Sequence, residues 1–308
     1  MNRRQMMWGS TSALLLAACA GSERAKSEMS DRVRLARRPG QPEVGIQTYT
    51  IRDAMAEDTP AALQMLKEVG YDFVENYPGD YENIALGDYI AMLDDAGLPV
   101  VASHFGFEVL DETPERAAEI LDAMGGRYAN LAYTPEEYRT TAGYTELADR
   151  FNAIGEVMRA NGSRFAYHNH HYEFWSTDGP RAGLDIYLED TDPELVDFEL
   201  DLFWAALGRR DVPALFRAHS GRFKLAHVKD MDQTRMSEFR EGNEDFGAIH
   251  EALMVDVGEG DLPLERWLGM RDISGIEHIV VEHDAPSKPL RDAVATSLAA
   301  IRSYNLSA

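Results

Sequence analysis

Four apolar segments in the second half of the chain each end close to a side chain that can bind a metal ion. The segments are RFAYHNHHYEF (164–174), LVDFELDLFW (195–204), FKLAHVKD (223–230) and EHIVVEHD (277–284). They supply Glu173, Asp201, His227 and Glu282. A mixed set of oxygen and nitrogen ligands suits one divalent cation such as Mn, Mg, Co or Zn. The recurrence of such residues at segment ends favours an enzyme.

The spacing within these segments matches the geometry of a β-strand, in which alternate residues share a face. In the second segment Val196, Phe198 and Leu200 fall on one face, and Glu199 and Asp201 on the other. The fourth segment alternates in the same way. Strands that are apolar toward covering helices and ionisable toward the opposite side predict a closed (β/α)₈ TIM barrel, an α/β fold.

The rest of the chain completes this alternation of strands and helices. Predicted strands are 43–48, 72–76, 99–104, 127–132 and 164–170, followed by the last three segments above. Predicted helices are 59–69, 86–96, 113–124, 144–161, 180–189, 211–219, 262–270 and 288–304. Glycine follows each of the first four helices, as expected at helix ends. We therefore expect one barrel domain over residues 43–308, close to the typical length of about 250 residues.

The first 20 residues begin with basic residues, continue with a short apolar run and end with small residues. This order predicts a secretory signal peptide. Arg3 and Arg4 resemble a twin-arginine export signal, and Leu16 to Cys19 resemble a lipoprotein box in which Cys19 is lipidated. An ordinary cleavage site is the alternative. Residues 21–42 are predicted to be a flexible tether. We expect an exported protein, periplasmic or membrane-anchored, that contacts a membrane only through this lipid anchor.

Composition excludes several classes of function. The chain has 53 acidic and 30 basic residues and a formal charge of −23. Such a surface repels nucleic acid, because binding to nucleic acid depends on phosphate neutralisation. Cys19 is the one cysteine of the chain, so the barrel carries no disulfide, thiolate metal site or cysteine nucleophile.

Seven motifs follow one another along the predicted barrel: GIQTYTIRDAM (45–55), GYDFVENY (70–77), YHNHHYEF (167–174), ELDLFWAALG (199–208), HVKDMD (227–232), VGEGDLPLERWL (257–268) and VEHD (281–284). Together they resemble one family, the sugar phosphate isomerase/epimerase group of the xylose isomerase-like TIM barrels. The resemblance implies a divalent metal held by a Glu, Asp, His and Glu set from the last four strands. The last three are Asp201, His227 and Glu282. The first is Glu173, reaching back from a loop, or a histidine of the fifth strand that replaces it.

Metal ligands of this kind suit the chemistry of sugar isomerisation. Isomerisation or epimerisation removes a proton from the carbon next to a carbonyl, and a metal acts as a Lewis acid on adjacent oxygens. Two carboxylates on opposite sides of that carbon can remove and return the proton. Glu173 and Glu282 are the candidates for this pair, and Lys229 is a candidate for stabilising a developing oxyanion.

Other polar or aromatic residues near strand ends are expected to bind the substrate. They are Gln47, Glu75, His104, His168, His170 and Trp204. Trp204 fits equally well in the core. His219 and His250 lie on or beside helical stretches and are expected at the surface.

Three functions are compatible with this sequence. The first is a metal-dependent isomerase or epimerase acting on an unphosphorylated small-molecule sugar or sugar derivative, which export favours. The second is a lyase or hydratase that uses the same enolate chemistry on oxidised (3-keto) glycosides. The third is a non-catalytic sugar-binding lipoprotein, which would not require the full set of metal ligands.

Overall fold

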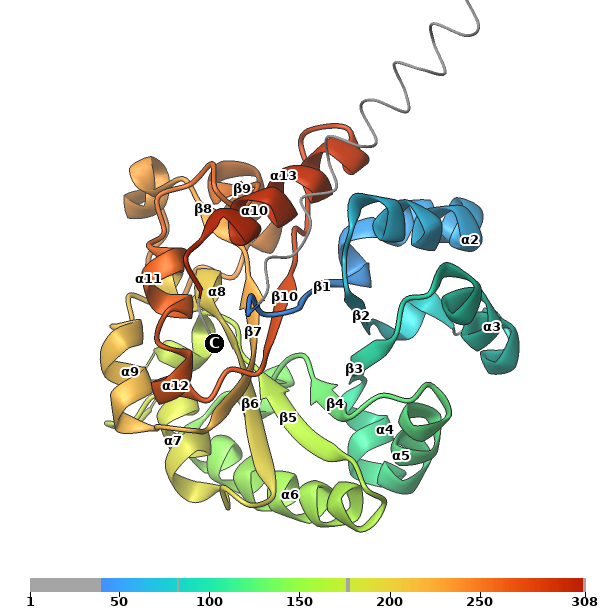
Figure 1. Cartoon of the computed structure of the whole chain (residues 1–308). Helices are drawn as coiled ribbons and strands as arrows, with labels where there is room; N and C mark the ends of the chain where they lie inside the picture. Colours follow the sequence, from blue (N-terminus) through green and yellow to red (C-terminus); the bar gives the residue numbers. More distant parts are fainter. Residues whose placement is uncertain (1–39, 82, 176–177, 307–308) are drawn as a thin grey trace, which may run out of the picture.

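Eight parallel strands close into a barrel in this computed structural model of the chain (Figure 1). The structure describes residues 40–81, 83–175 and 178–306. The predicted signal peptide, and the predicted tether as far as residue 39, lie outside the described residues. The strand order around the barrel is β1-β10-β7-β6-β5-β4-β3-β2. The predicted (β/α)₈ fold is therefore confirmed.

The barrel strands coincide with the predicted ones to within a few residues. They are β1 (Val44–Gln47), β2 (Phe73–Asn76), β3 (Val100–Phe105), β4 (Tyr128–Leu131), β5 (Arg164–His168), β6 (Val196–Asp201), β7 (Phe223–Val228) and β10 (His278–Val281). Strand β6 ends at Asp201, earlier than its apolar sequence indicates. The Asp201 side chain accepts a hydrogen bond from the Trp204 N–H, 2.9 Å away, and so caps the next helix.

Helices cover the outside of the barrel (Figure 1). They are α2 (Arg52–Val69), α3 (Leu86–Ala96), α4 (Phe107–Glu112), α5 (Pro114–Ala123), α6 (Thr141–Ala160), α7 (Gly183–Asp190), α8 (Leu202–Leu207), α9 (Val212–Ala218), α11 (Leu264–Leu268), α12 (Arg271–Ser274) and α13 (Leu290–Ser303). Short 3₁₀ helices are Thr48–Ile51, Pro78–Asp80, Glu136–Tyr138, Tyr172–Phe174 and Gln233–Glu238. Helix α2 begins before the predicted 59–69 segment and is kinked at Asp58. Gly70 ends it with a φ of 113°, a left-handed conformation that favours glycine.

The barrel interior has three levels, because residues two apart on a strand share a face. The lowest level is mainly apolar and aromatic: Phe73, Ala102, Tyr128, Ala166, Leu225 and His278. The middle level is polar and buried: Gln47, Glu75, His104, Asn130, Glu199 and His227. The upper level carries charge: His168, Asp201, Lys229 and Glu282. The fold thus places ionisable groups at the carboxyl ends of the strands, where TIM-barrel active sites lie.

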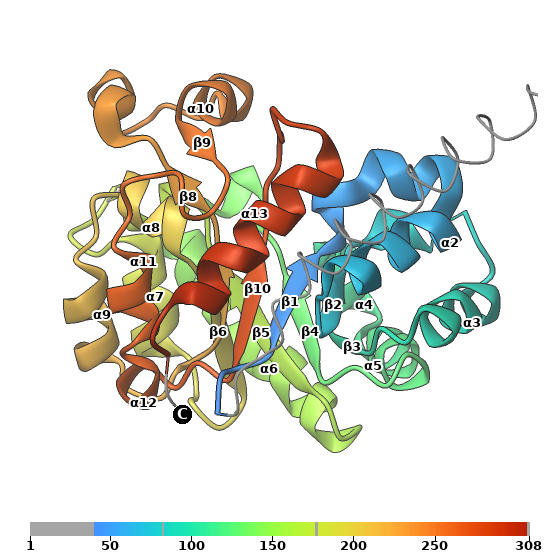
Figure 2. The same ribbon diagram turned by 45° about the horizontal axis from the view of Figure 1, so that its top comes forward.

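A long excursion between β7 and β10 rises above this end of the barrel (Figure 2). Its base is a two-stranded antiparallel ribbon of β8 (Asp230–Met231) and β9 (Met254–Val255). It carries α10 (Phe246–Leu253). Neither the ribbon nor α10 was predicted from the sequence.

The buried carboxylate of Asp230 ties the base of this excursion to the turn that carries the VGEGD motif. It accepts backbone hydrogen bonds from Met231 (2.8 Å), Gly258 (2.9 Å), Gly260 (3.2 Å) and Leu262 (3.2 Å). A Cβ on Gly260 would lie 2.3 Å from the Asp230 Oδ1, so glycine is required there. The motif therefore serves to position the chain.

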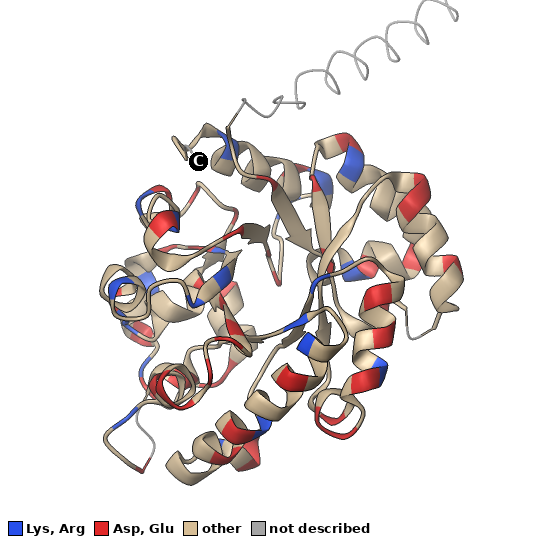
Figure 3. Ribbon diagram, turned by 60° about the horizontal axis from the view of Figure 1, so that its bottom comes forward, with Lys and Arg blue, Asp and Glu red and all other residues tan. Residues whose placement is uncertain are grey.

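Acidic and basic positions are interleaved along the outer helices (Figure 3). Arg164 pairs with Asp197 at 2.7 Å, and Lys224 pairs with Glu277 at 3.2 Å, near the amino ends of the barrel strands. Among the described residues, no helix combines the length and apolar character needed to cross a bilayer.

We predict that Asp230→Ala lowers the free energy of unfolding by about 3 kcal/mol, because it leaves buried N–H groups without an acceptor. Asp261→Ala is the control. Its carboxylate accepts one hydrogen bond, from the exposed Gln233 N–H at 3.0 Å, and its loss should cost less than about 1 kcal/mol. Urea unfolding of both variants measures the difference. Equal stability of the two would contradict this role for Asp230.

Candidate metal centre and pocket

Four buried side chains from neighbouring strand ends meet at the top of the barrel. They are His168, Asp201, His227 and Glu282, which we call the outer group. One candidate ligand atom from each lies within 4.8 Å of the others. Parallel strands bring them together because β5, β6, β7 and β10 are consecutive neighbours in the barrel. Of the four ligands predicted from the sequence, the structure brings together Asp201, His227 and Glu282.

The hydrogen bonding of the outer group leaves ligand atoms available for a cation. His168 Nε2, Asp201 Oδ2 and His227 Nδ1 are buried and make no hydrogen bond of good geometry among the described residues. Two of them have charged neighbours, since Asp201 Oδ2 lies 3.2 Å from Lys229 Nζ and His227 Nδ1 lies 3.0 Å from Glu282 Oε2. Buried polar atoms normally have a partner, so atoms left without one require an explanation. A divalent cation would satisfy all three at once, and the nitrogen and oxygen donors suit Mn, Co or Zn.

Charge at the site leads to the same conclusion. Lys229 Nζ lies 3.2 Å from Asp201, 2.6 Å from Glu282 and 3.0 Å from Asp284. Burial alone would lower the pKa of Lys229, but the three carboxylates raise it well above its ordinary value. Burial alone would raise the pKa of Glu282, but Lys229 and His227 hold it well below. One ammonium against three carboxylates leaves negative charge that a divalent cation would neutralise.

Glu173 lies apart from the outer group, so the structure does not support it as a metal ligand or as a base in this pocket. The 3₁₀ helix Tyr172–Phe174 turns its carboxylate toward the outer side of β5. There it accepts hydrogen bonds from the Tyr167 hydroxyl and from the His170 N–H, the latter at 2.7 Å. Tyr167 packs on Phe151 outside the barrel.

The fifth-strand histidine takes the position that Glu173 was predicted to fill. His168 is the last residue of β5, and its Nδ1 lies 3.2 Å from the Ala132 carbonyl oxygen. An Nδ1–H that donates to this carbonyl leaves the Nε2 lone pair facing Asp201, 3.4 Å away. This is how metal-binding histidines are commonly oriented.

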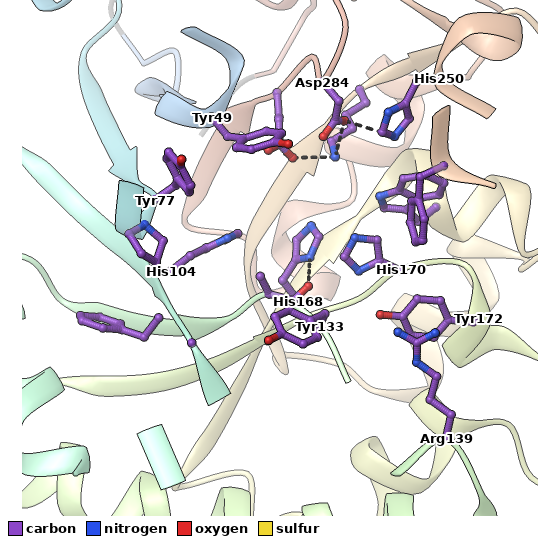
Figure 4. Close-up of a pocket in the computed structure, with 18 residues that line it drawn as sticks. Tyr49, Tyr77, His104, Tyr133, Arg139, His168, His170, Tyr172, His250 and Asp284 are labelled. Atoms are coloured by element: carbon purple, nitrogen blue, oxygen red, sulfur yellow. Dashed lines mark hydrogen bonds and ion pairs between the residues drawn. The ribbon is translucent and has the colours of Figure 1, made fainter. Parts of the chain in front are cut away.

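A cavity of about 640 Å³ opens above the outer group (Figure 4). Six residues predicted to act in catalysis or binding line it: His104, His168, His170, Trp204, Lys229 and Glu282. Trp204 does so while only 1% exposed, and its ring stacks on His171 at 4.9 Å. It is therefore both part of the core and part of the pocket wall.

Several lining residues were not predicted as site residues. They include Tyr49, Tyr77, Tyr133, Arg139, Tyr172, Phe246, His250 and Asp284. The expectation that His250 lies at the surface was wrong, because the excursion folds α10 over the barrel. His250 Nε2 lies 3.8 Å from Asp284 Oδ2. Asp284 is the last residue of the VEHD motif, two residues after Glu282. This proximity to a predicted ligand was the one sequence signal that could have identified Asp284 as a pocket residue.

Gln47 and Glu75 do not line the cavity, although they were predicted to bind substrate. Both are fully buried one level below it. Glu75 contacts His227 and accepts a hydrogen bond from Gln47 at 3.0 Å. His104 connects the two levels, since it lines the cavity and lies 3.1 Å from Glu199. Burial would lower the pKa of His104, but Glu75 and Glu199 raise it to about 9.

Residues 63–304 match the family described as xylose isomerase-like TIM barrel. The chain therefore belongs to the xylose isomerase-like TIM barrel family. Its barrel and the position of its outer group agree with the resemblance seen in the sequence motifs.

Individual relatives are distant. An inosose dehydratase of Salmonella typhimurium (strain LT2) is 25% identical over 147 residues, 47% of this chain and 48% of that protein. The match thus spans about half the length of this relative. A sugar phosphate isomerase/epimerase structure from Parabacteroides distasonis ATCC 8503 has a TM-score of 0.74 at 24% identity, covering 90% of this chain and 99% of that one. The IOLI protein with a bound zinc atom has a TM-score of 0.63 at 14% identity, with coverage of 85% and 99%. The structural likenesses support the fold.

We predict that the purified barrel binds one divalent cation and that His168→Ala weakens this binding by at least tenfold, because it removes one of four ligands. Glu173→Gln should bind the cation as wild type does. Calorimetric titration of the metal-free proteins with Zn²⁺ or Mn²⁺ measures both. The opposite ranking of the two variants would restore Glu173 as the first ligand.

We predict a pH-dependent stability that comes from Glu173. Burial raises the pKa of this carboxyl from 4.5 to about 7, despite its hydrogen bonds. The folded state therefore binds an extra proton between these pH values, and stability falls as pH rises through this window. Between pH 5 and pH 8 the loss from this group should be roughly 2–3 kcal/mol. Glu173→Gln should remove that part of the slope in urea unfolding with a chelator present, and parallel pH profiles would contradict it.

Proposed function

We propose that this chain is a metal-dependent sugar isomerase or epimerase that removes a proton from the carbon next to a carbonyl. The observation that carries the proposal is the outer group of unpartnered, buried ligand atoms at the floor of an aromatic pocket. Packing alone does not account for such a set. The ion pair of Glu282 with Lys229 stands beside it, at 2.6 Å.

A divalent cation held by His168, Asp201, His227 and Glu282 would supply Lewis acidity to adjacent substrate oxygens. Glu282 lines the pocket and is ionised, so it can accept a proton from carbon. Lys229 stays protonated, and its ammonium can donate to an oxygen on which negative charge develops. The two groups thus form a base and a donor on the same wall.

The pocket walls suit an uncharged, polyhydroxylated substrate. Seven of the lining residues are aromatic: Tyr49, Tyr77, Phe105, Tyr133, Tyr172, Trp204 and Phe246. Among the described lining residues the permanent cations are Arg139 and Lys229, and both are engaged by carboxylates. Arg139 also lies 3.6 Å from the centre of the Tyr172 ring. No cation is left for a phosphate group, so we propose an unphosphorylated sugar, which agrees with the export predicted from the leader.

A dehydratase or lyase is the second candidate, and the position of the carboxylates favours it. Epimerisation by two carboxylates requires them on opposite faces of the substrate carbon. The two carboxylates that line the cavity, Glu282 and Asp284, both follow β10, whereas Glu173 lies outside it. A base and an acid on one wall suit removal of a proton and a hydroxyl from the same face. The inosose dehydratase relative is consistent with this alternative.

The two candidates differ in their products. Metal-loaded protein is incubated in deuterated water with free, oxidised and glycosidic sugars, and the products are followed by NMR. An isomerase or epimerase gives an isomer that carries deuterium at the reacting carbon. A dehydratase or lyase gives an unsaturated product and releases water or an aglycone. Absence of exchange with every sugar would favour a binding protein instead.

We predict that Glu282→Gln retains most substrate affinity but loses turnover by at least ~10²-fold, the usual scale for a general base. Gln keeps the shape and one oxygen, but it cannot accept the proton. Glu173→Gln is the matched control and should exchange the substrate proton as wild type does. Exchange by Glu282→Gln at the wild-type rate would exclude Glu282 as the base.

A further inference from the structure

A second set of buried ionisable side chains lies one level below the outer group. Glu75, His104, Glu199 and His227, which we call the inner group, also have candidate ligand atoms within 4.8 Å of one another. His227 belongs to both groups through different nitrogens. Its Nδ1 lies 3.0 Å from Glu282 Oε2, whereas its Nε2 contacts Glu75 and lies 3.3 Å from Glu199 Oε2. One imidazole therefore joins the two levels.

The two groups differ in their hydrogen bonds. Both oxygens of Glu75 are engaged, since Oε1 accepts from Asn130 at 2.6 Å and Oε2 accepts from Gln47 at 3.0 Å and contacts His227 Nε2. In the outer group three buried atoms, His168 Nε2, Asp201 Oδ2 and His227 Nδ1, make no hydrogen bond among the described residues, whereas in the inner group Glu199 Oε1 is the one such atom apart from the shared imidazole. The inner group is therefore more fully hydrogen-bonded, and the outer group has more ligand atoms available for a cation. The inner and outer groups thus have different roles, although their residue types are similar.

We propose that Glu75 is a positioning residue that fixes the tautomer and direction of His227. Its carboxylate accepts the proton of His227 Nε2, so that Nδ1, which faces Glu282 at 3.0 Å, is the nitrogen that would bind a cation in the outer group. A neutral imidazole carries one proton, so the partner of one nitrogen decides what the other can bind. This inference rests on the proposed function only in taking the outer group as the metal site.

The fold holds Glu75 in place from two sides. In the parallel pair of β1 and β2, Glu75 lies opposite Gln47, which donates to it. Phe73, two residues earlier on the same face, crosses over Gly45. A Cβ on Gly45 would lie 2.1 Å from the Phe73 ring, so a larger residue there would displace β2. Side chain and backbone therefore both aim the Glu75 carboxylate at His227.

The charge of Glu75 adds to its geometric effect. A carboxylate that accepts the distal N–H of a metal-binding histidine makes the other nitrogen a stronger donor. Loss of such a partner typically weakens metal binding by 10–100-fold. Burial strengthens the interaction further, because Glu75 and His227 are both fully buried, where the local dielectric is low. Glu75 should thus control metal affinity without touching metal or substrate.

Glu75→Gln tests the proposal, because it keeps the size of the side chain and removes the charge. Calorimetric titration of the metal-free variant with Zn²⁺ should show one site, about 10–100-fold weaker than in wild type. NMR of Zn²⁺-loaded, ¹⁵N-histidine-labelled protein should show a strongly downfield Nε2 proton of His227 in wild type, because this proton is shared with a carboxylate. The same proton should move upfield in the variant, which a purely structural role of Glu75 would not cause.

Glu199→Gln is the matched control in the same level. Glu199 lies 3.3 Å from His227 Nε2, but its Oε2 also accepts a hydrogen bond from Asn130 at 2.9 Å and lies 3.1 Å from His104, so this change should weaken Zn²⁺ binding less than Glu75→Gln does. Circular dichroism checks that both variants fold. If Glu75→Gln does not fold, Glu75→Asp keeps the charge, withdraws it from His227 and should weaken binding in the same direction.

Three results would overturn the proposal. The first is wild-type affinity in Glu75→Gln, and the second is an unchanged shift of the His227 Nε2 proton in the Zn²⁺-loaded variant. The third is two Zn²⁺ ions per wild-type chain with one lost in Glu75→Gln, which would make the inner group a metal site itself. If wild type binds no metal, the proposed function fails, whereas metal binding that Glu75→Gln leaves unchanged contradicts the role of Glu75 alone.

Discussion

The imidazole of His227 joins two buried levels of charge, and the arrangement of the upper barrel depends on it. Its Nε2 contacts Glu75 below, and its Nδ1 faces Glu282 above. A buried charge is tolerated only when it is paired or binds a metal. The lower level meets this condition largely with hydrogen bonds within the chain. The upper level meets it in part through the ion pairs of Lys229, and we assign its remaining negative charge and its ligand atoms to a divalent cation.

This division explains why the same barrel end can be both stable and reactive. The lower level is buried except for His104, which reaches the cavity, and its hydrogen bonds support His227. The upper level opens into a pocket whose aromatic walls suit a sugar and whose carboxylates, Glu282 and Asp284, stand on one side. Both isomerisation and dehydration begin with removal of a proton next to a carbonyl. The loops that surround the pocket determine which of them follows.

The sequence predicted the barrel well, because alternation along a strand is a local property. The face that carries Glu199 and Asp201 was correctly placed inside. The level that a side chain occupies along the barrel axis was not predicted. Alternation along a strand shows which side chains point into the barrel, but it does not distinguish Glu75 at the middle level from a residue that lines the pocket. Glu173 was misjudged because a 3₁₀ turn directs it outward, and His250 because a long excursion brings a distant helix over the pocket. Contacts of this kind depend on tertiary packing.

The central claim is that the outer group alone holds the metal, and anomalous diffraction from crystals grown with Zn²⁺ tests it most directly. The account predicts one anomalous peak, about 2.0–2.2 Å from atoms of His168, Asp201, His227 and Glu282. Lys229 should then move away from Asp201 and Glu282 and keep its contact with Asp284. A peak between Glu75, His104 and Glu199, or a peak with Glu173 as a ligand, would contradict the account.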